Sequence, residues 1–227
     1  MTDEDLAERL RSVDERIAHA ARVAGRDPVE LTRIVVTKFH PASLVRRLFE
    51  LGVRDIGENR HQEAAAKAAE LSDLELRWHF VGQLQSNKAR AVRRYARTVH
   101  SVDRPSLVDA LAAREGETEL GVFIELNLTD DPARGGADPR DAEALAERIA
   151  AADGLTLLGV MAVAPLGGDP RPAFARVRAV SDNIRRIVPG ADAISAGMSA
   201  DFGEAISEGA THLRIGTAIT GKRSTRG

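Results

Sequence analysis

The chain has 227 residues with 32 Lys plus Arg and 34 Asp plus Glu, a formal net charge of −2, so no overall electrostatic field would attract nucleic acid and we expect no nucleic-acid partner. It contains no cysteine, which excludes a disulfide framework, a thiolate nucleophile and a Cys-ligated zinc, and we expect no metal site. Because no long apolar run occurs and the N-terminus lacks the pattern of a signal peptide, we expect a cytoplasmic protein that does not enter a membrane.

Apolar residues recur at three- and four-residue spacing near the N-terminus, which predicts an amphipathic helix over about 3–24, ended by Gly25. Its apolar face consists of Leu6, Leu10, Val13, Ile17, Ala20, Ala21 and Ala24. From Leu31 onward, short β-branched runs alternate with Ala-, Glu- and Arg-rich amphipathic stretches, a pattern typical of βα units around a parallel sheet.

Eight strands are predicted in the rest of the sequence, over 31–38, 53–58, 76–82, 98–101, 120–127, 156–164, 193–197 and 212–219. The helices between them are predicted to begin near Ala42, Arg60, Ser86, Pro105, Pro139, Pro172 and Ala200. No Gly-x-Gly-x-x-Gly follows the first strand, which argues against a doubly wound dinucleotide-binding sheet. The pattern therefore predicts an α/β fold, a (β/α)8 TIM barrel over about 31–221 with an extra N-terminal helix, and the whole of 1–227 as a single domain.

The longest irregular stretches, 129–137 and 165–170, each follow a predicted strand. The first contains Asp130, Asp131 and Pro132, with Gly135 and Gly136 behind them. Active sites of such barrels lie at the C-terminal ends of the strands, so we expect both stretches to be loops at this mouth.

Lys38 ends the otherwise apolar first strand and is followed by Phe39, His40 and Pro41. Desolvation at a barrel mouth lowers the pKa of a lysine and leaves more free amine to attack a carbonyl and form a Schiff base. A lysine at the rim that pairs with a carboxylate such as Glu58 is an equally good interpretation of this segment alone.

Two turns near the C-terminus have the composition of a phosphate site. The segment from Ser195 to Asp201 leads from the seventh predicted strand into a helix, and Gly216 and Thr217 follow Arg214 in the eighth. Barrels commonly bind phosphate at these two places, where small residues expose N–H groups and hydroxyl side chains add donors. The same residues would also serve as plain turns and a helix cap.

A Schiff-base lysine and a phosphate site on one rim describe a pocket for an aldehyde that carries a phosphate, and pyridoxal 5′-phosphate (PLP) is such a molecule. Arg214 is placed to face the pyridine nitrogen, where its permanent charge would disfavour protonation of that nitrogen. A salt bridge at the rim is the alternative role for this arginine. A Schiff-base aldolase acting on a phosphorylated sugar would use the same lysine and phosphate site.

Seven blocks of the sequence resemble, in order, the YggS/PROSC family of pyridoxal phosphate homeostasis proteins. They are 36–41, 57–63, 78–88, 100–103, 159–165, 195–201 and 214–221. The resemblance implies a fold-type III barrel like the N-terminal domain of alanine racemase. It also implies a protein that binds PLP as an internal aldimine and acts in PLP homeostasis, without established catalytic turnover.

The resemblance also implies roles for individual residues. Lys38 would form the aldimine, Asn59 would lie beside it near the ring, and Arg214 would face the pyridine nitrogen. Ser199, Gly216 and Thr217 would hold the phosphate. The residues expected to bind the cofactor are thus Lys38, Asn59, His79, Met198, Ser199, Arg214, Gly216 and Thr217. For His79, which lies in the third predicted strand, a hydrogen-bonded histidine of the interior is the other interpretation.

Two positions depart from the family pattern. Ala196 stands where a methionine is usual, and Thr220 where an aromatic residue often follows. Neither change removes a polar contact, so the packing of the pocket is affected more than the binding of the cofactor.

Racemisation needs a base on each face of the cofactor, and no second base is evident. Related racemases take theirs, a tyrosine, from an additional β domain and a dimer partner. The only tyrosine here, Tyr95, lies in the predicted helical run 90–97, away from the mouth, and the sequence extends six residues beyond Gly221. We therefore expect no enzyme activity beyond a weak racemase type. We also expect a monomer, with PLP and apo forms of PLP-dependent enzymes as partners.

Overall fold

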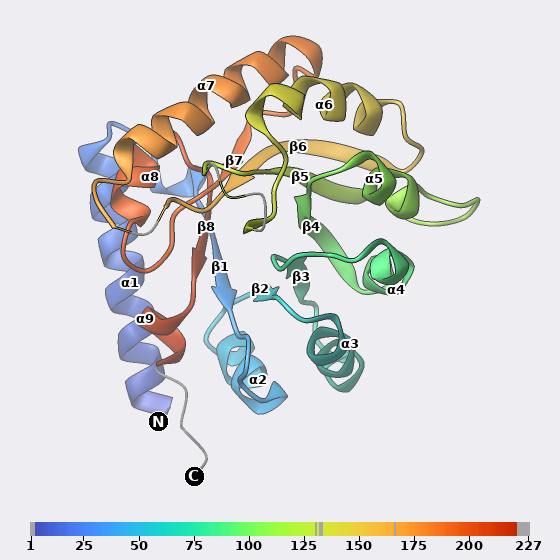
Figure 1. Cartoon of the computed structure of the whole chain (residues 1–227). Helices are drawn as coiled ribbons and strands as arrows, with labels where there is room; N and C mark the ends of the chain where they lie inside the picture. Colours follow the sequence, from blue (N-terminus) through green and yellow to red (C-terminus); the bar gives the residue numbers. More distant parts are fainter. Residues whose placement is uncertain (1–2, 130, 132–133, 166, 222–227) are drawn as a thin grey trace.

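The computed structural model describes residues 3–129, 131, 134–165 and 167–221. Eight parallel strands follow one another in chain order around a closed barrel, and the last strand pairs with the first. Helices alternate with the strands and surround them (Figure 1). The predicted TIM barrel is confirmed.

The strands are short and most lie within one or two residues of their predicted ends. They are β1 (Thr32–Val36), β2 (Asp55–Glu58), β3 (Arg77–Phe80), β4 (Ala96–Val102), β5 (Leu120–Leu126), β6 (Leu155–Ala162), β7 (Ala193–Ser195) and β8 (His212–Ile215). Two predicted ends were wrong in a way that affects the site. β1 ends at Val36, so Lys38 lies in the turn after the strand, and 217–219, predicted as strand, belong to a short helix. An apolar run such as Ala218-Ile219 does not by itself distinguish a strand from a helix.

All helices of the βα units except the last, which was not predicted, begin within three residues of their predicted starts. They are α2 (Ala42–Glu50), α3 (His61–Glu70), α4 (Ala89–Arg93), α5 (Pro105–Leu111), α6 (Ala142–Ala150), α7 (Arg171–Ile187), α8 (Phe202–Ser207) and α9 (Thr217–Thr220), with short 3-10 turns η1 (Pro28–Glu30), η2 (Ser86–Lys88) and η4 (Pro139–Asp141). The helical run predicted over 90–97 was too long, because α4 ends at Arg93 and Ala96 already begins β4. Tyr95 lies between them.

The extra N-terminal helix α1 (Asp3–Val23) packs against α8 and α9, the helices that follow β7 and β8 (Figure 1). Its predicted apolar face is largely buried, with Leu6, Leu10, Val13, Ile17 and Ala21 in the core and Ala20 and Ala24 packed against it. Burial of such a stripe is what holds an amphipathic helix to a domain. α1 therefore supports the side of the barrel where the two predicted phosphate turns lie.

The loops after β5 and β6 leave the C-terminal ends of their strands, as predicted. Asp130, Pro132 and Leu166, which fall in the two stretches predicted as loops, lie outside the described residues, as do 1–2 and 222–227 of the predicted domain.

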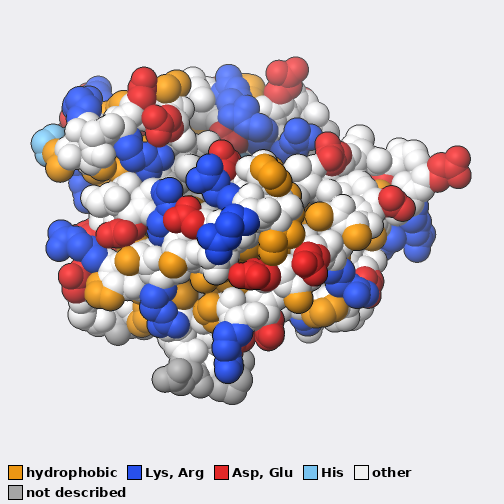
Figure 2. Space-filling model, turned by 90° about the horizontal axis from the view of Figure 1, so that it is seen from above, with side chains coloured by type: hydrophobic (Ala, Val, Ile, Leu, Met, Phe, Trp, Pro, Cys, Tyr) orange, Lys and Arg blue, Asp and Glu red, His pale blue; other side chains and the backbone are white. Residues whose placement is uncertain are grey.

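Charges of both signs are interspersed on the face over α6 and α7, which Figure 2 views from above. None of the helices in the described part of the chain is long and apolar enough to cross a membrane.

Candidate functional site

The two ends of the barrel sequence meet at its C-terminal mouth. β1 pairs with β8, with Val35 opposite Ile215, and the two strands lie side by side although far apart in sequence (Figure 1). A Cβ atom built on Gly216 would lie 3.8 Å from the Cβ of Val36, two residues before Lys38. The turn that carries Gly216 and Thr217 is therefore next to the turn that carries Lys38.

The turns after β7 and β8 also touch each other. The hydroxyl of Ser199 accepts a hydrogen bond from the backbone N–H of Ala218, with 3.4 Å between the heavy atoms. Thr220 donates its hydroxyl to the carbonyl of Gly216 at 3.2 Å and steadies the second turn. The turns after β1, β7 and β8 are thus neighbours at the C-terminal mouth.

The environment of Lys38 differs from the one that the sequence predicts. Its side chain is exposed, so the desolvation expected at this position is not seen in the structure. The alternative pairing with Glu58 is wrong, because Glu58 is bound to Lys67 instead. Among the described residues, no hydrogen-bond or ion-pair partner holds the ammonium of Lys38. The described contacts therefore give the Lys38 ammonium no structural role.

The backbone directly before Lys38 is fixed by a buried ion pair that the sequence pattern did not reveal. Lys67 of α3 donates to Glu58 Oε1 at 2.5 Å and to the carbonyl of Thr37 at 2.9 Å, and the Thr37 hydroxyl donates to the same carboxylate at 2.6 Å. Burial raises the pKa of Glu58, while the hydrogen bonds from Lys67 and Thr37 oppose this rise. The cluster anchors the end of β1 to β2 and α3.

Phe39, directly after Lys38, has a backbone φ of 67°, and no other described residue except glycines has a positive φ. Such a conformation is costly for a bulky side chain and persists only where surrounding contacts require it. Its N–H donates to Glu63 Oε2 at 3.2 Å, and the guanidinium of Arg60 lies 5.0 Å from its ring. Contacts on both sides of Lys38 therefore define the direction of the turn.

Asn59 directly follows β2 at the same mouth. Its Oδ1 atom is buried and has no hydrogen-bond partner among the described residues. Gly82, after β3, packs against its backbone, since a Cβ on Gly82 would come within 2.2 Å of the Asn59 carbonyl oxygen. A buried polar atom without a partner at a mouth is a natural contact for a ligand.

The other residues of the two turns differ in how accessible their polar groups are to a ligand. The N–H of Met198 donates to the carboxylate of Asp201 at 2.6 Å and so is not available to a phosphate. Ser199 is partly exposed and Thr217 is exposed, which leaves their hydroxyls accessible. Ala196 and Thr220, the two departures from the family pattern, are both buried.

Arg214 lies inside the barrel, where only 5% of its surface is exposed. Its Nη1 donates to the carbonyl and to the hydroxyl of Ser195, each at 2.6 Å, and its Nη2 donates to the carbonyl of Ala162 at 2.9 Å. Burial lowers the pKa of Arg214 to about 10, so it remains charged at neutral pH. The salt bridge at the rim that the sequence left open is absent among the described contacts.

His79 is also inside the barrel. Its Nε2 lies 2.9 Å from Asp55 Oδ1 and its Nδ1 lies 3.0 Å from His100 Nε2. Both ring nitrogens are thus occupied by protein groups, which leaves none for a direct hydrogen bond to a cofactor. The interpretation as a hydrogen-bonded interior histidine describes these contacts. Sequence reasoning gave no role to His100 or Ser195, although both stand in the family-like blocks.

Glu125 is a further residue that the sequence analysis missed, although a carboxylate in the apolar strand β5 is a signal. Its Oε2 atom is buried without a partner among the described residues. Burial raises its pKa from the ordinary 4.5 to about 7, the nearby Asp103 charge adds to the rise, and Arg214 opposes it.

A pH dependence of stability follows from Glu125. Between about pH 4.5 and 7 the folded chain keeps a proton that the unfolded chain releases. The contribution of this group to stability is therefore complete below 4.5 and falls by roughly 3 kcal/mol as the pH rises through this window. Urea unfolding of the wild type and Glu125→Gln at a series of pH values measures it. The two stability curves should diverge across the window, and parallel curves would contradict the assignment.

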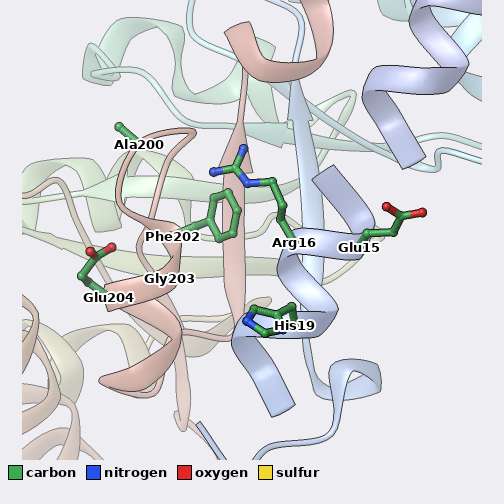
Figure 3. Close-up of a pocket in the computed structure, with 7 residues that line it drawn as sticks. All are labelled: Glu15, Arg16, His19, Ala200, Phe202, Gly203 and Glu204. Carbon is green, nitrogen blue, oxygen red and sulfur yellow. The ribbon is translucent and has the colours of Figure 1, made fainter. Parts of the chain in front are cut away.

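A cavity lies elsewhere, on the outer side of the turn after β7. It has a volume of about 440 Å³ and lies between Glu15, Arg16 and His19 of α1 and the residues Ala200 to Glu204 (Figure 3). The guanidinium of Arg16 is 4.8 Å from the centre of the Phe202 ring. None of the predicted site residues lines this cavity.

Comparison with known proteins agrees with the fold. Residues 9–224 match the sequence model of the family "Alanine racemase, N-terminal domain". The chain is 41% identical to a pyridoxal phosphate homeostasis protein of Pseudomonas aeruginosa over 96% of each chain. It is 39% identical to that of Mycobacterium tuberculosis over 99% of this chain and 95% of the relative.

Two solved structures are similar to this chain, one at 35% identity and one that shares only the fold. PipY of Synechococcus elongatus, solved with PLP bound, is 35% identical with a TM-score of 0.81 over 94% of this chain and 99% of that one. Alanine racemase of Corynebacterium glutamicum has a TM-score of 0.72 at 15% identity, and the match covers 96% of this chain but 60% of the racemase, so this likeness shows the fold alone. The chain belongs to the alanine racemase N-terminal domain family and, within it, to the pyridoxal phosphate homeostasis proteins.

Proposed function

We propose that this protein holds PLP at the mouth of its barrel through a Schiff base on Lys38 and acts in PLP homeostasis. The observation that supports the proposal is that the turns which carry Lys38, Gly216 and Ser199 are neighbours at the C-terminal mouth. In the bond-forming step the Lys38 amine adds to the aldehyde carbon, a carbon–nitrogen double bond replaces the carbonyl, and one water leaves. The names of the relatives, and the PLP bound to PipY, support the same cofactor.

The residues present fit such a group. The hydroxyls of Ser199 and Thr217 are accessible on the two touching turns and would donate to phosphate oxygens. The unpartnered Oδ1 of Asn59 lies beside the end of β2 and would contact the ring. Arg214 would present its guanidinium to the pyridine nitrogen and disfavour its protonation. Bound PLP with an unprotonated ring is a weak electron sink, which suits retention of the cofactor better than transamination.

We also propose that the protein has little or no catalytic turnover. Tyr95, its single tyrosine, stacks on His61 at the start of α3, with ring centres 5.9 Å apart, in the helix layer around the barrel. Its hydroxyl lies 3.4 Å from His61 Nδ1, so this histidine contacts both its ring and its hydroxyl. The occupied nitrogens of His79 remove a second candidate base. Transfer of PLP from this protein to apo-enzymes, and action as a cytoplasmic monomer, stay predictions.

Removal of Lys38 tests the proposal. The wild type incubated with PLP should acquire a visible absorption band, and borohydride should convert it to a stable adduct of the protein. Lys38→Ala should abolish band and adduct because Lys67 is buried in its ion pair with Glu58 and the other described lysine, Lys88, lies in η2. Lys88→Ala, which removes an exposed lysine of η2, is the matched control and should behave as the wild type.

Persistence of the adduct in folded Lys38→Ala would reject the assignment. A wild-type protein that gains no visible band with PLP but forms a reducible adduct with a phosphorylated sugar would instead favour a Schiff-base aldolase.

A further inference from the structure

A continuous line of hydrogen-bonded side chains crosses the barrel interior beneath Arg214. We call it the interior network, and its members are Arg214, Ser195, His100, His79 and Asp55. Arg214 Nη1 lies 2.6 Å from Ser195 Oγ, which lies 2.9 Å from His100 Nδ1. His100 Nε2 lies 3.0 Å from His79 Nδ1, and His79 Nε2 lies 2.9 Å from Asp55 Oδ1. The network thus links β8 to β2 through β7, β4 and β3.

Polar and charged side chains are unusual in the interior of such a barrel. The interior of such a barrel is generally filled by branched aliphatic side chains. His79, His100, Ser195 and Arg214 are each at most 5% exposed, so every unsatisfied polar atom among them would be costly. The ring of His100 also stacks on Phe123, with 4.5 Å between centres, which holds it in place.

The two ends fix the direction of the outer bonds, and one proton on each ring then fixes the inner ones. A guanidinium only donates and a carboxylate only accepts, so Arg214 is the donor end and Asp55 the acceptor end. Between them, Ser195 donates its hydroxyl to His100 Nδ1, His100 donates from Nε2 to His79, and His79 donates from Nε2 to Asp55. Each ring then carries one proton, and every hydrogen bond of the network has one donor and one acceptor.

The opposite direction leaves a group unsatisfied. A doubly protonated His79 would make His100 donate to Ser195 Oγ, which already accepts from Arg214. The hydroxyl proton of Ser195 would then have no acceptor among the described contacts.

Other charged groups face the network along its length. Arg77 binds Asp55 through two hydrogen bonds of 2.7 and 2.5 Å, and Arg33 lies close enough to interact with the same carboxylate. His212 meets the ring of His100 edge-on at 6.4 Å, and Glu125 and Asp201 act on Arg214. Burial lowers the pKa of His100 well below its ordinary value and that of His212 to about 4, so both rings are neutral at neutral pH.

We propose that Asp55, His79, His100 and Ser195 are positioning residues for Arg214, joined in a one-way network that fixes its guanidinium in a single orientation. The role toward the cofactor rests on the proposed function, because only bound PLP gives the orientation a consequence. The state of the network itself is a property of the protein alone.

The test begins with nitrogen NMR of the histidine rings and the Arg214 guanidinium in the protein without PLP. His79 and His100 should both be neutral with the proton on Nε2, and the Arg214 Nη protons should give separate, slowly exchanging signals. In Ser195→Ala those separate signals should be lost, and in Ser195→Thr, which keeps the hydroxyl, they should return. Ser181→Ala, which removes a buried serine of α7 outside the network, is the matched control.

The same variants with PLP give the second measurement. The pH midpoint of the visible band should shift in Ser195→Ala and Asp55→Leu, return in Ser195→Thr, and stay unchanged in Ser181→Ala. A proton on Nδ1 of His100, or Arg214 signals unaffected by Ser195→Ala, would overturn the proposal. An unshifted midpoint in Ser195→Ala would overturn its role toward the cofactor. If the wild type gave no visible band at all, the proposed function would fail. The NMR signals would still show whether the network orients Arg214.

Discussion

Replacement of Lys67 by methionine is expected to lower the free energy of unfolding by about 3–5 kcal/mol. The Lys67 and Glu58 side chains are 9% and 1% exposed, so removal of the cation leaves a carboxylate buried without its counter-charge. The loss also frees the carbonyl of Thr37, which Lys67 holds at 2.9 Å. Urea unfolding measures the effect.

Two comparisons make this prediction specific to the ion pair. Lys88→Met changes an exposed lysine and should alter stability by no more than about 0.5 kcal/mol. The double variant Glu58→Gln with Lys67→Met removes both charges but keeps an acceptor for the Thr37 hydroxyl, and should recover most of the loss. Equal losses in Lys67→Met and Lys88→Met, or a double variant as unstable as the single one, would show that the pair does not stabilise the end of β1.

Replacement of Gly197 by alanine is expected to destabilise the fold by about 2 kcal/mol or more and to weaken PLP retention. Gly197 has a φ of +90°, which costs an L-residue roughly 1–2 kcal/mol. The added Cβ would also lie 2.8 Å from Ala205 Cβ and 2.9 Å from Phe202 Cα. Relief of these contacts moves the turn that carries Ser199 away from α9.

Gly203 supplies the control for Gly197. It lies in α8, and a Cβ there would meet nothing within 4 Å. Gly203→Ala should therefore stabilise the protein by about 0.5–1 kcal/mol, the ordinary gain from alanine in a helix. Thermal unfolding and the fraction of PLP kept after dialysis measure both variants, and a Gly197→Ala protein that matched Gly203→Ala would contradict the account.

The order of strands and helices was accessible from the sequence because each unit has its own hydrophobic period and its own start and stop residues. The ends of the elements were less accessible. The turn after β1 is set by the contacts of Thr37 with Glu58 and Lys67, which come from β2 and α3. No local pattern around Lys38 contains this information.

The candidate site was predictable where the fold itself assigns a position. Lys38 after β1, Ser199 after β7 and Gly216 after β8 follow from the rule that parallel strands end at a common mouth. The interior network was not predictable, because the contact between His79 and His100 depends on the register of β3 against β4, which shifts between Trp78 and His79. The family resemblance identified blocks that contain His79, His100 and Ser195, but it did not predict the hydrogen bonds between them.

The crystal structure of the protein grown with PLP would test the central claim most directly. The account predicts continuous density from Lys38 Nζ to the cofactor, with the phosphate against Ser199, Gly216 and Thr217. Density that joined the cofactor to Lys67 or Lys88, or that placed it in the cavity between α1 and α8, would contradict it.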